Sequence, residues 1–162
     1  MKRRPLRLLA IDLTARGFGY ALLDAELGLL DWGFCGVLAT DDTAFMSRIE
    51  ERVGRGQPTV LVLENFGRVP ERANALRRLG LVMSFAEDHH LGVCQVSRVV
   101  VQRVLGLTTK TEIARALGEK YPELRQRVPP RRRRSMQEDD RMHIFDALSY
   151  ALAVMDPLAW ST

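Results

Sequence analysis

The stretch LLAIDLTARGFGYALLD, residues 8–24, decides the expected fold, because it holds two apolar runs on either side of a glycine-bearing turn. The first run covers residues 7–13 and closes on one acid, Asp12, and the second covers residues 18–23. A short apolar run is typical of a strand that is buried on both faces. The stretch therefore predicts two strands joined by a turn, with a carboxylate at the end of the first strand.

The segments downstream first continue this pattern and then change it. Residues 27–38 fit a third strand, which would complete an antiparallel meander with the first two. After it, apolar runs alternate with helical patterns. The further strands expected are residues 59–63 and 93–97, the helices expected are residues 40–56, 70–90, 109–121 and 139–155, and residues 98–106 fit either a strand or a short helix. This order predicts an α/β protein with a mixed five-stranded sheet, three antiparallel strands followed by two parallel ones, and helices on both faces.

Local signals set the expected ends of two helices. Asp41 or Asp42 can cap the first helix, and Gly54 and Gly56 can end it. The sequence TKTE, residues 109–112, has the spacing of a capping box and predicts the start of a later helix.

The length of 162 residues predicts a single domain, residues 1–162, that is large enough to bury a core. The N-terminus is basic and then apolar, as in a secretion signal, but the apolar run is cut at Asp12 and no cleavage site follows. No later run approaches the roughly 20 apolar residues that span a bilayer. We therefore expect a cytoplasmic protein that does not associate with a membrane.

The two cysteines, Cys35 and Cys94, lie far apart in separate apolar segments. They have neither the paired spacing of a structural zinc site nor the number that a disulfide framework needs. Two buried free thiols are the expected arrangement.

Basic residues are unevenly distributed along the chain. The net charge of +4 hints at a polyanionic partner, and the densest basic block is PPRRRR, residues 129–134. Residues 122–138 show no clear period, and such a long connection is uncommon in a compact domain unless it is functional or disordered. The pattern predicts a basic loop at about residues 125–138, inserted before the last helix, that either binds nucleic acid or solubilises the protein.

A carboxylate closes two of the expected central strands. Asp12 ends the first strand and Glu64 ends the fourth. A buried carboxylate without a partner costs several kcal/mol or takes up a proton. Two such acids at neighbouring strand ends would repel one another unless a cation lies between them. Mg²⁺ or Mn²⁺, which prefer oxygen ligands, would remove this conflict.

The last expected helix supplies further ligand candidates. At 100° per residue, one narrow stripe carries Asp139, His143, Asp146 and Tyr150. Asp140 would point to the apolar side of a helix, so Asp139 is the preferred additional acid. Helix starts fray, and either acid could be an N-cap instead.

Each candidate also has a structural alternative. Asp12 could cap a turn, and Glu64 could pair with a nearby arginine. Asp146 could be an exposed helix acid, and His143 could be a satisfied polar residue on the helix edge. The four residues together are a more specific signal than any one of them, because four separate positions in the chain are all expected at the same end of the sheet.

Three segments together resemble the RuvC branch of the ribonuclease-H-like fold, the Holliday junction resolvases. They are AIDLTARGFGYALLD, VLVLEN and HIFDALSYALA, and the resemblance covers nearly the whole chain in the same order. The resemblance implies that Asp12, Glu64, His143 and Asp146 are catalytic and hold two Mg²⁺ or Mn²⁺ ions, with Asp139 as a further candidate ligand. It implies phosphodiester hydrolysis by a two-metal mechanism, in which Asp12 bridges both ions.

The resemblance also implies residues that contact DNA. An aromatic shortly after the strand-end acid would be Phe66, although its spacing differs by one residue. Lys110, just inside the capped helix, is a candidate phosphate contact, although lysines at helix starts are usually only solvated. The arginine run would bind the DNA backbone, and its members are Arg131, Arg132, Arg133 and Arg134.

The expected partner is branched DNA, a four-way junction, and the expected assembly is a homodimer, because such an enzyme cuts two symmetric strands. Residues 70–90 carry apolar side chains on more than one side, which could serve a dimer interface or the core. Two departures put junction specificity in question. Leu13 and Thr14 stand where the family has Pro-Gly, and residues 125–140 are longer than in a typical bacterial resolvase.

Two other functions remain open from the sequence. The first is a member of the same fold that binds nucleic acid without catalysis, or that cuts flaps, forks or RNA hybrids. The second is a sugar-kinase-like or actin-like ATPase, because residues 11–24 also resemble the first phosphate hairpin of that fold. Such ATPases need two domains of this kind, which 162 residues cannot hold.

Overall fold

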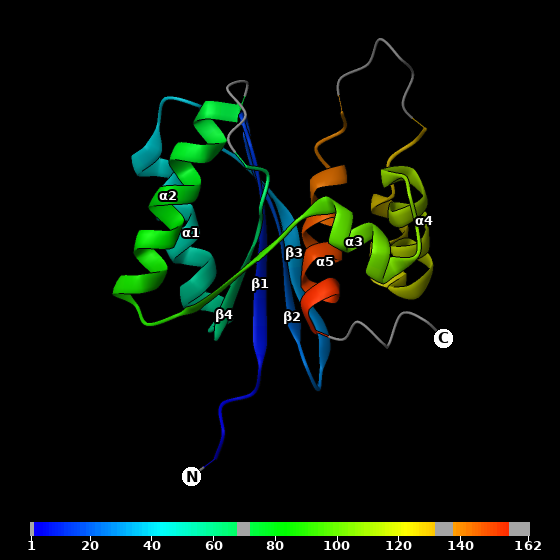
Figure 1. Ribbon diagram of the computed structural model, residues 1–162, viewed down its shortest axis with the longest axis horizontal. Helices are drawn as coiled ribbons and strands as arrows, with labels where there is room; N and C mark the ends of the chain where they lie inside the picture. Colours follow the sequence, from blue (N-terminus) through cyan, green and yellow to red (C-terminus); the bar gives the residue numbers. More distant parts are fainter. Residues whose placement is uncertain (1, 68–71, 132–137, 156–162) are drawn as a thin grey trace.

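Five strands form one mixed sheet at the centre of the computed structural model, which describes residues 2–67, 72–131 and 138–155 (Figure 1). The strands are β1 (Arg7–Thr14), β2 (Gly17–Asp24), β3 (Gly28–Gly36), β4 (Val60–Glu64) and β5 (Gly92–Val96). Their order across the sheet is β3-β2-β1-β4-β5. β1, β2 and β3 pair antiparallel, whereas β4 pairs parallel to both β1 and β5. The predicted sheet is confirmed.

Helices cover both faces of this sheet, as predicted (Figure 1). They are α1 (Asp42–Gly56), α2 (Ala73–Asp88), α3 (Arg98–Leu105), α4 (Lys110–Lys120), the 3-10 helix η2 (Pro122–Arg127) and α5 (Met142–Met155). In Figure 1, α1 and α2 lie on one side of the sheet. On the other side α5 lies against the strands, with α3 and α4 beyond it. The molecule is therefore a three-layer arrangement with two separate hydrophobic clusters.

The alternation of side chains along β1 assigns Asp12 to one of these layers. Leu9 and Ile11 pack in the cluster that α1 and α2 cover, whereas Leu8 and Ala10 pack in the cluster on the α5 side. Successive side chains of a strand point to opposite faces, so Asp12 continues the second series. Its carboxylate therefore faces α5. β1 continues two residues beyond Asp12, so this acid lies near the end of the strand and not at the end itself.

The capping signals were partly right. The side chain of Asp41 accepts a hydrogen bond from the backbone N–H of Ala44 and caps α1, and the capping box of α4 is complete. α1 ends at Gly56, one of the two glycines that the sequence offered as its end, whereas Gly54 lies inside the helix. The C-cap that follows is Gln57, in the left-handed region with φ of 49°. That role usually belongs to glycine, which pays no steric cost there.

Three other segments differ from the expected pattern. Residues 98–106 form the short helix α3, capped by the side chain of Ser97 and ended by Gly106. α2 is shorter than the expected helix, and part of the expected first turn, residues 70 and 71, lies outside the described residues. The start of the expected loop is not irregular, because Pro122–Arg127 form a 3-10 helix that Leu124 anchors in the core.

Candidate active site

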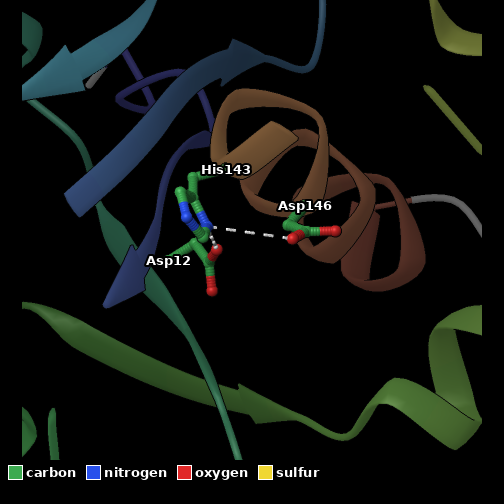
Figure 2. Close-up of side chains that lie close together, drawn as sticks. All are labelled: Asp12, His143 and Asp146. Atoms are coloured by element: carbon green, nitrogen blue, oxygen red, sulfur yellow. Dashed lines mark hydrogen bonds and ion pairs between the residues drawn. The ribbon is translucent and has the colours of Figure 1, made fainter. Parts of the chain in front are cut away.

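Asp12, His143 and Asp146 converge at the junction of β1 and α5 (Figure 2). One ligand atom from each residue lies within 4.8 Å of the other two, and all three residues are buried. The Nδ1 atom of His143 lies 2.7 Å from Oδ2 of Asp12 and 4.0 Å from Oδ2 of Asp146. The structure therefore brings together three of the four residues that the sequence singled out as catalytic.

Asp12 is oriented by two donors from α5. The hydroxyl of Tyr150 donates to Oδ1 at 3.1 Å, and the imidazole of His143 contacts Oδ2. Tyr150 is almost fully buried, and burial together with the charges of Asp12 and Asp146 raises its pKa well above the usual 10.0. It therefore stays protonated and remains a donor. Tyr150 lies on the helical stripe that the sequence predicted, but no sequence pattern indicates its hydrogen bond.

A glycine in β2 creates the space for His143. The strand register places Gly19 opposite Asp12 on one side and Phe34 on the other. A Cβ atom at position 19 would lie 2.6 Å from the Cβ of His143, which real structures do not tolerate. Gly19 lies inside β2 and lets α5 approach the sheet, a role that an apolar run on its own does not indicate.

Phe34 contacts the other side of the His143 ring. The two ring centroids lie 5.8 Å apart at an interplanar angle of 30°. His143 thus lies between the carboxylate of Asp12 and an aromatic ring of β3, which fixes its orientation. Sequence reasoning missed Phe34, because neither its residue type nor its place in an apolar strand distinguishes it from a core residue.

Asp146 carries the least favourable charge in the site. Burial and, second, the charge of Asp12 raise the pKa of its carboxyl from 3.8 to about 6, although Lys110 and Arg98 oppose this shift. Arg98 contacts Oδ1 at 3.1 Å, and Lys110 contacts Oδ2 at 2.9 Å. Two basic side chains do not fully compensate the two neighbouring acids, so the site favours a further cation.

His143 and Lys110 respond to this excess of acid. Burial alone would lower the pKa of His143, but its hydrogen bond to Asp12 and the charge of that carboxylate outweigh burial and raise it. Burial also works against the charged form of Lys110, and the attraction of Asp146 and Glu138 outweighs it and raises the pKa. Both groups therefore hold their protons more firmly than they would in water.

Glu64 ends β4, as predicted, on the same side of the sheet as Asp12. Ile11 pairs with Leu63 in the parallel register, which brings Asp12 and Glu64 to neighbouring positions. Glu64 is not among the three residues within 4.8 Å of one another. Its carboxylate pairs with Arg72 at 3.1 Å, as the structural alternative for this residue anticipated. Both residues line the cleft that also exposes Asp12 and His143, with a volume of about 460 Å³.

Phe66 does not project freely from the site. The guanidinium of Arg72 lies over its ring at 3.9 Å, and the ring packs against the cluster beneath α1 and α2. A role of Phe66 in DNA contact would require Arg72 to move. No motif or spacing in the sequence distinguishes Arg72 from other surface arginines.

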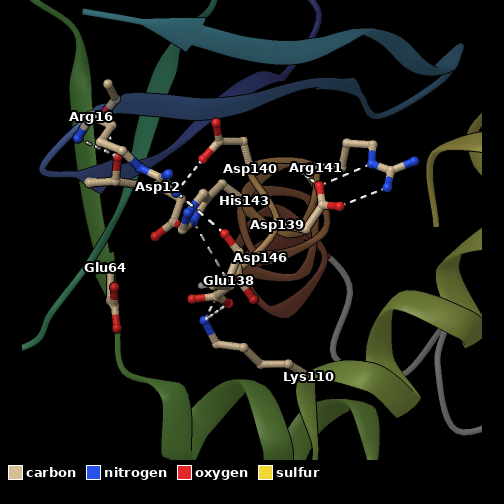
Figure 3. A network of polar contacts seen from close by, with 12 residues as sticks. Asp12, Arg16, Glu64, Lys110, Glu138, Asp139, Asp140, Arg141, His143 and Asp146 are labelled. Carbon is tan, nitrogen blue, oxygen red and sulfur yellow. Dashed lines mark hydrogen bonds and ion pairs between the residues drawn. The ribbon is translucent and has the colours of Figure 1, made fainter. Parts of the chain in front are cut away.

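Asp139 and Asp140 pair with arginines (Figure 3). Arg141 binds the Asp139 carboxylate with contacts of 2.9 and 2.7 Å and lowers its pKa, and Asp140 pairs with Arg16 at 2.5 Å. α5 begins at Met142, so the prediction that Asp139 shares a helical stripe with His143 is wrong. The turn before the helix rotates its side chain away from the expected direction.

Of the three consecutive acids at residues 138–140, Glu138 is the one that lines the cleft (Figure 3). Its Oε1 lies 2.6 Å from the ammonium nitrogen of Lys110. Lys110 is therefore engaged by Glu138 and Asp146 and is not merely a solvated lysine. Of the arginine run, Arg131 is exposed, and Arg132, Arg133 and Arg134 lie outside the described residues.

The described part of the chain bears on the expectations for a membrane-spanning helix and for the two cysteines. Within residues 2–67, 72–131 and 138–155, no helix is both long and apolar enough to cross a membrane. Cys35 and Cys94 are free thiols and are partly rather than fully buried.

The donor set fits a divalent metal ion. Two carboxylates and an imidazole, close together and buried, offer the oxygen and nitrogen ligands that Mg²⁺ and Mn²⁺ accept. The raised pKa of Asp146 adds a physical reason, because a cation would relieve the repulsion between Asp146 and Asp12.

Comparison with known proteins places this geometry on a known fold. No protein-family model and no curated protein sequence matches the chain. Among solved structures, Thermus thermophilus RuvC is similar with a TM-score of 0.66 and 21% identity, covering 91% of this chain and 92% of that one. The same protein in complex with a Holliday junction substrate gives a TM-score of 0.64 and 19% identity, covering 91% of both chains. The yeast mitochondrial Holliday junction resolvase Ydc2 gives a TM-score of 0.62 and 15% identity, covering 96% of this chain and 80% of that one. The chain therefore has the ribonuclease-H-like fold that RuvC has, as the sequence predicted.

Proposed function

We propose that this protein is a metal-dependent, structure-selective DNA endonuclease that resolves four-way junctions by hydrolysing phosphodiester bonds. The observation that carries the proposal is the convergence of Asp12, His143 and Asp146 within 4.8 Å on the fold of RuvC. Two of the similar structures are resolvases described with Holliday junction DNA, from Thermus thermophilus and from fowlpox virus. The second has a TM-score of 0.54 and 13% identity and covers 93% of this chain and 97% of that one.

The clustered acids and His143 are the proposed metal ligands. Asp12, Asp146 and Glu64 would supply carboxylate oxygens to two Mg²⁺ or Mn²⁺ ions, and His143 would supply a ring nitrogen or orient water. Bound ions of this kind activate the attacking water and stabilise the leaving 3′ oxygen. Tyr150 holds Asp12 in a fixed orientation through its hydroxyl.

Phosphate contacts would come from Lys110 in the cleft and from the basic run that follows η2. Lys110 lines the cleft beside Asp146, and Arg131 lies at the start of the run Arg131, Arg132, Arg133 and Arg134. Each phosphate that such residues neutralise makes DNA binding more sensitive to salt. A junction has two equivalent strands to cut, so we also propose that the active form is a homodimer.

The decisive experiment is cleavage of a synthetic four-way junction with Mg²⁺ and then with EDTA. Flap, fork, RNA-hybrid and duplex substrates serve as controls. We expect paired, symmetric nicks near the crossover that EDTA abolishes. The matched variants are Asp12→Asn, which removes a proposed ligand, and Asp31→Asn, which removes the charge of a half-exposed acid on β3 that pairs only distantly with Arg52, at 3.7 Å.

The possible outcomes separate the candidate functions. Cleavage of flaps or RNA hybrids alone would assign a different substrate to the same site. If the wild type were as inactive as Asp12→Asn on every branched substrate, the nuclease function would be contradicted, and junction binding without cleavage would support the non-catalytic alternative. ATP binding without DNA binding would support the ATPase alternative.

A further inference from the structure

Asp146 is held by two basic side chains that occupy both of its oxygens. Arg98 contacts Oδ1 at 3.1 Å, and Lys110 contacts Oδ2 at 2.9 Å. A carboxylate that becomes a metal ligand turns at least one oxygen toward the ion. A divalent ion on either oxygen repels the basic side chain that contacts it, so metal binding at Asp146 favours the loss of at least one of these two contacts.

The two basic residues differ in what else retains them. Lys110 also contacts Glu138 at 2.6 Å, so it keeps one carboxylate when Asp146 turns away. For Arg98, Asp146 is the only acid within ion-pair distance in the described ranges 2–67, 72–131 and 138–155. The Arg98 side chain is also 30% exposed and lines the cleft, so it has space to move. Of the two, Arg98 is the contact that a metal ion displaces more easily.

The position of Arg98 is not explained by the stability of its own helix. It is the first residue of α3, directly after the cap Ser97. The positive end of a helix dipole disfavours a cation at this position. An arginine there is consistent with a role toward the cleft rather than toward α3.

The charges that line the cleft determine whether it can hold a DNA phosphate. Among the residues that the structure describes, three acids and three Arg or Lys side chains line it together with His143, so the Arg and Lys charges are offset by the acids and leave no excess for a phosphate. The acids are Asp12, Glu64 and Glu138, and the basic residues are Arg72, Arg98 and Lys110. A divalent ion on Asp146 would add positive charge and would release a guanidinium, which matches a phosphate with two parallel hydrogen bonds.

We propose that Arg98 is an exchangeable counter-ion of Asp146. It pairs with this carboxylate while no divalent ion is bound, and it binds a backbone phosphate of the DNA once an ion has replaced it. The inference rests on the proposed nuclease function and adds that metal binding and DNA binding are coupled through one side chain. Coupling of this kind is reciprocal, so DNA also tightens metal binding.

The test compares the full-length wild type with Arg98→Gln and with the matched control Arg103→Gln. Arg103 lies in the last turn of the same helix, is exposed, and does not line the cleft. Mn²⁺ affinity is measured by calorimetry at pH 8, and junction affinity is measured in Ca²⁺ and in EDTA. Thermal unfolding checks that each variant is folded.

Arg98→Gln removes a competitor from Asp146, so we expect it to bind Mn²⁺ about threefold to tenfold more tightly than the wild type. We expect it to bind the junction about tenfold more weakly in Ca²⁺, because a charge-assisted phosphate contact is lost, and within about twofold of the wild type in EDTA. Arg103→Gln should change the Mn²⁺ affinity by less than about twofold, since a distant exposed charge is largely screened. Arg98→Lys should restore the junction affinity in Ca²⁺ in part.

Two results would overturn the exchange. One is an unchanged or weaker Mn²⁺ affinity of Arg98→Gln, and the other is an equal loss of junction affinity in Ca²⁺ and in EDTA. The Mn²⁺ measurement does not depend on the DNA substrate, so tighter Mn²⁺ binding by Arg98→Gln supports the counter-ion role even if junction cleavage fails. A wild type that binds no Mn²⁺ would overturn the inference and the metal-dependent function together.

Discussion

Asp12 and Asp24 are two buried aspartates near opposite ends of the β1–β2 pair, and their surroundings differ in kind. Asp24 accepts a hydrogen bond from Arg7 at 2.8 Å and two more from the backbone N–H groups of Glu26 and Leu27. These donors come from the adjoining turn and the neighbouring strand. They lower the pKa of Asp24, with the Arg7 hydrogen bond as the largest cause.

Asp12 has partners that come from far along the chain. His143 and Tyr150 reach it from α5, and a second acid, Asp146, lies beside it. Asp24 is matched by donors, whereas at the other end burial and, second, the charge of Asp12 raise the pKa of Asp146 to about 6. A buried carboxylate with local donors supports the fold, whereas one placed beside a second acid costs stability and prepares a binding site.

The largest expected effect comes from Asp12→Asn. The substitution keeps the size of the side chain and removes the charge that would hold the metal ions. We expect the rate of Mg²⁺-dependent junction cleavage to fall by about a thousandfold or more, because metal-ion stabilisation is worth several kcal/mol. Single-turnover cleavage measures this. A loss of less than tenfold would contradict the assignment of Asp12.

The next effect is expected from Gly19→Ala at the same end of the pair. The added Cβ would collide with the backbone and Cβ of His143, so α5 would have to move away from the sheet. We expect the free energy of unfolding to fall by about 2–3 kcal/mol, as for other overpacked cores, and cleavage to fall with it. Gly54→Ala is the control, since a Cβ there meets no atom within 4 Å and helix propensity should make it neutral or stabilising. Denaturant titration of both variants decides between these outcomes.

Asp24→Asn should have the opposite profile to Asp12→Asn. It weakens the pairing with Arg7 and the turn that follows β2, so we expect the unfolding temperature to fall by several degrees. Cleavage per folded molecule should stay unchanged. The pKa of Asp24 lies below its usual 3.8, so its stabilising contribution is present above that pH and disappears as the pH falls through the lowered value. Loss of activity without loss of stability would contradict a structural role.

An effect of opposite sign is expected from Asp146→Asn on stability in EDTA. The pKa of Asp146 is about 6 in the folded protein and 3.8 in its ordinary state, so the ionised carboxylate destabilises the fold above pH 6. We expect the substitution to raise the free energy of unfolding by about 1–3 kcal/mol at pH 8. The gain should be smaller at pH 5 and absent below pH 3.8. Denaturant titrations at these pH values would reveal a destabilised variant at pH 8, which is the result that contradicts this interpretation.

Much of the fold could be predicted from local patterns. The five strands, their antiparallel and parallel pairing, and the capping box at Thr109 all follow from short-range rules on turns, apolar runs and caps. The errors occur at ends of elements. Gln57 rather than a glycine is the left-handed C-cap of α1, and α5 begins at Met142, because packing decides where a helix that could continue actually stops.

By itself, the sequence determined on which side of its strand or helix each of the acids and the histidine would lie. The alternation of β1 directs Asp12 to one face, Glu64 ends the neighbouring parallel strand, and His143 and Asp146 share one side of a helix because they are three residues apart. These relations need only the periods of a strand and a helix. Only the tertiary structure decided which cations accompany them. Arg98 and Lys110 are 48 and 36 residues from Asp146 in the chain, and their contacts depend on how α3 and α4 pack against α5, which no local period encodes.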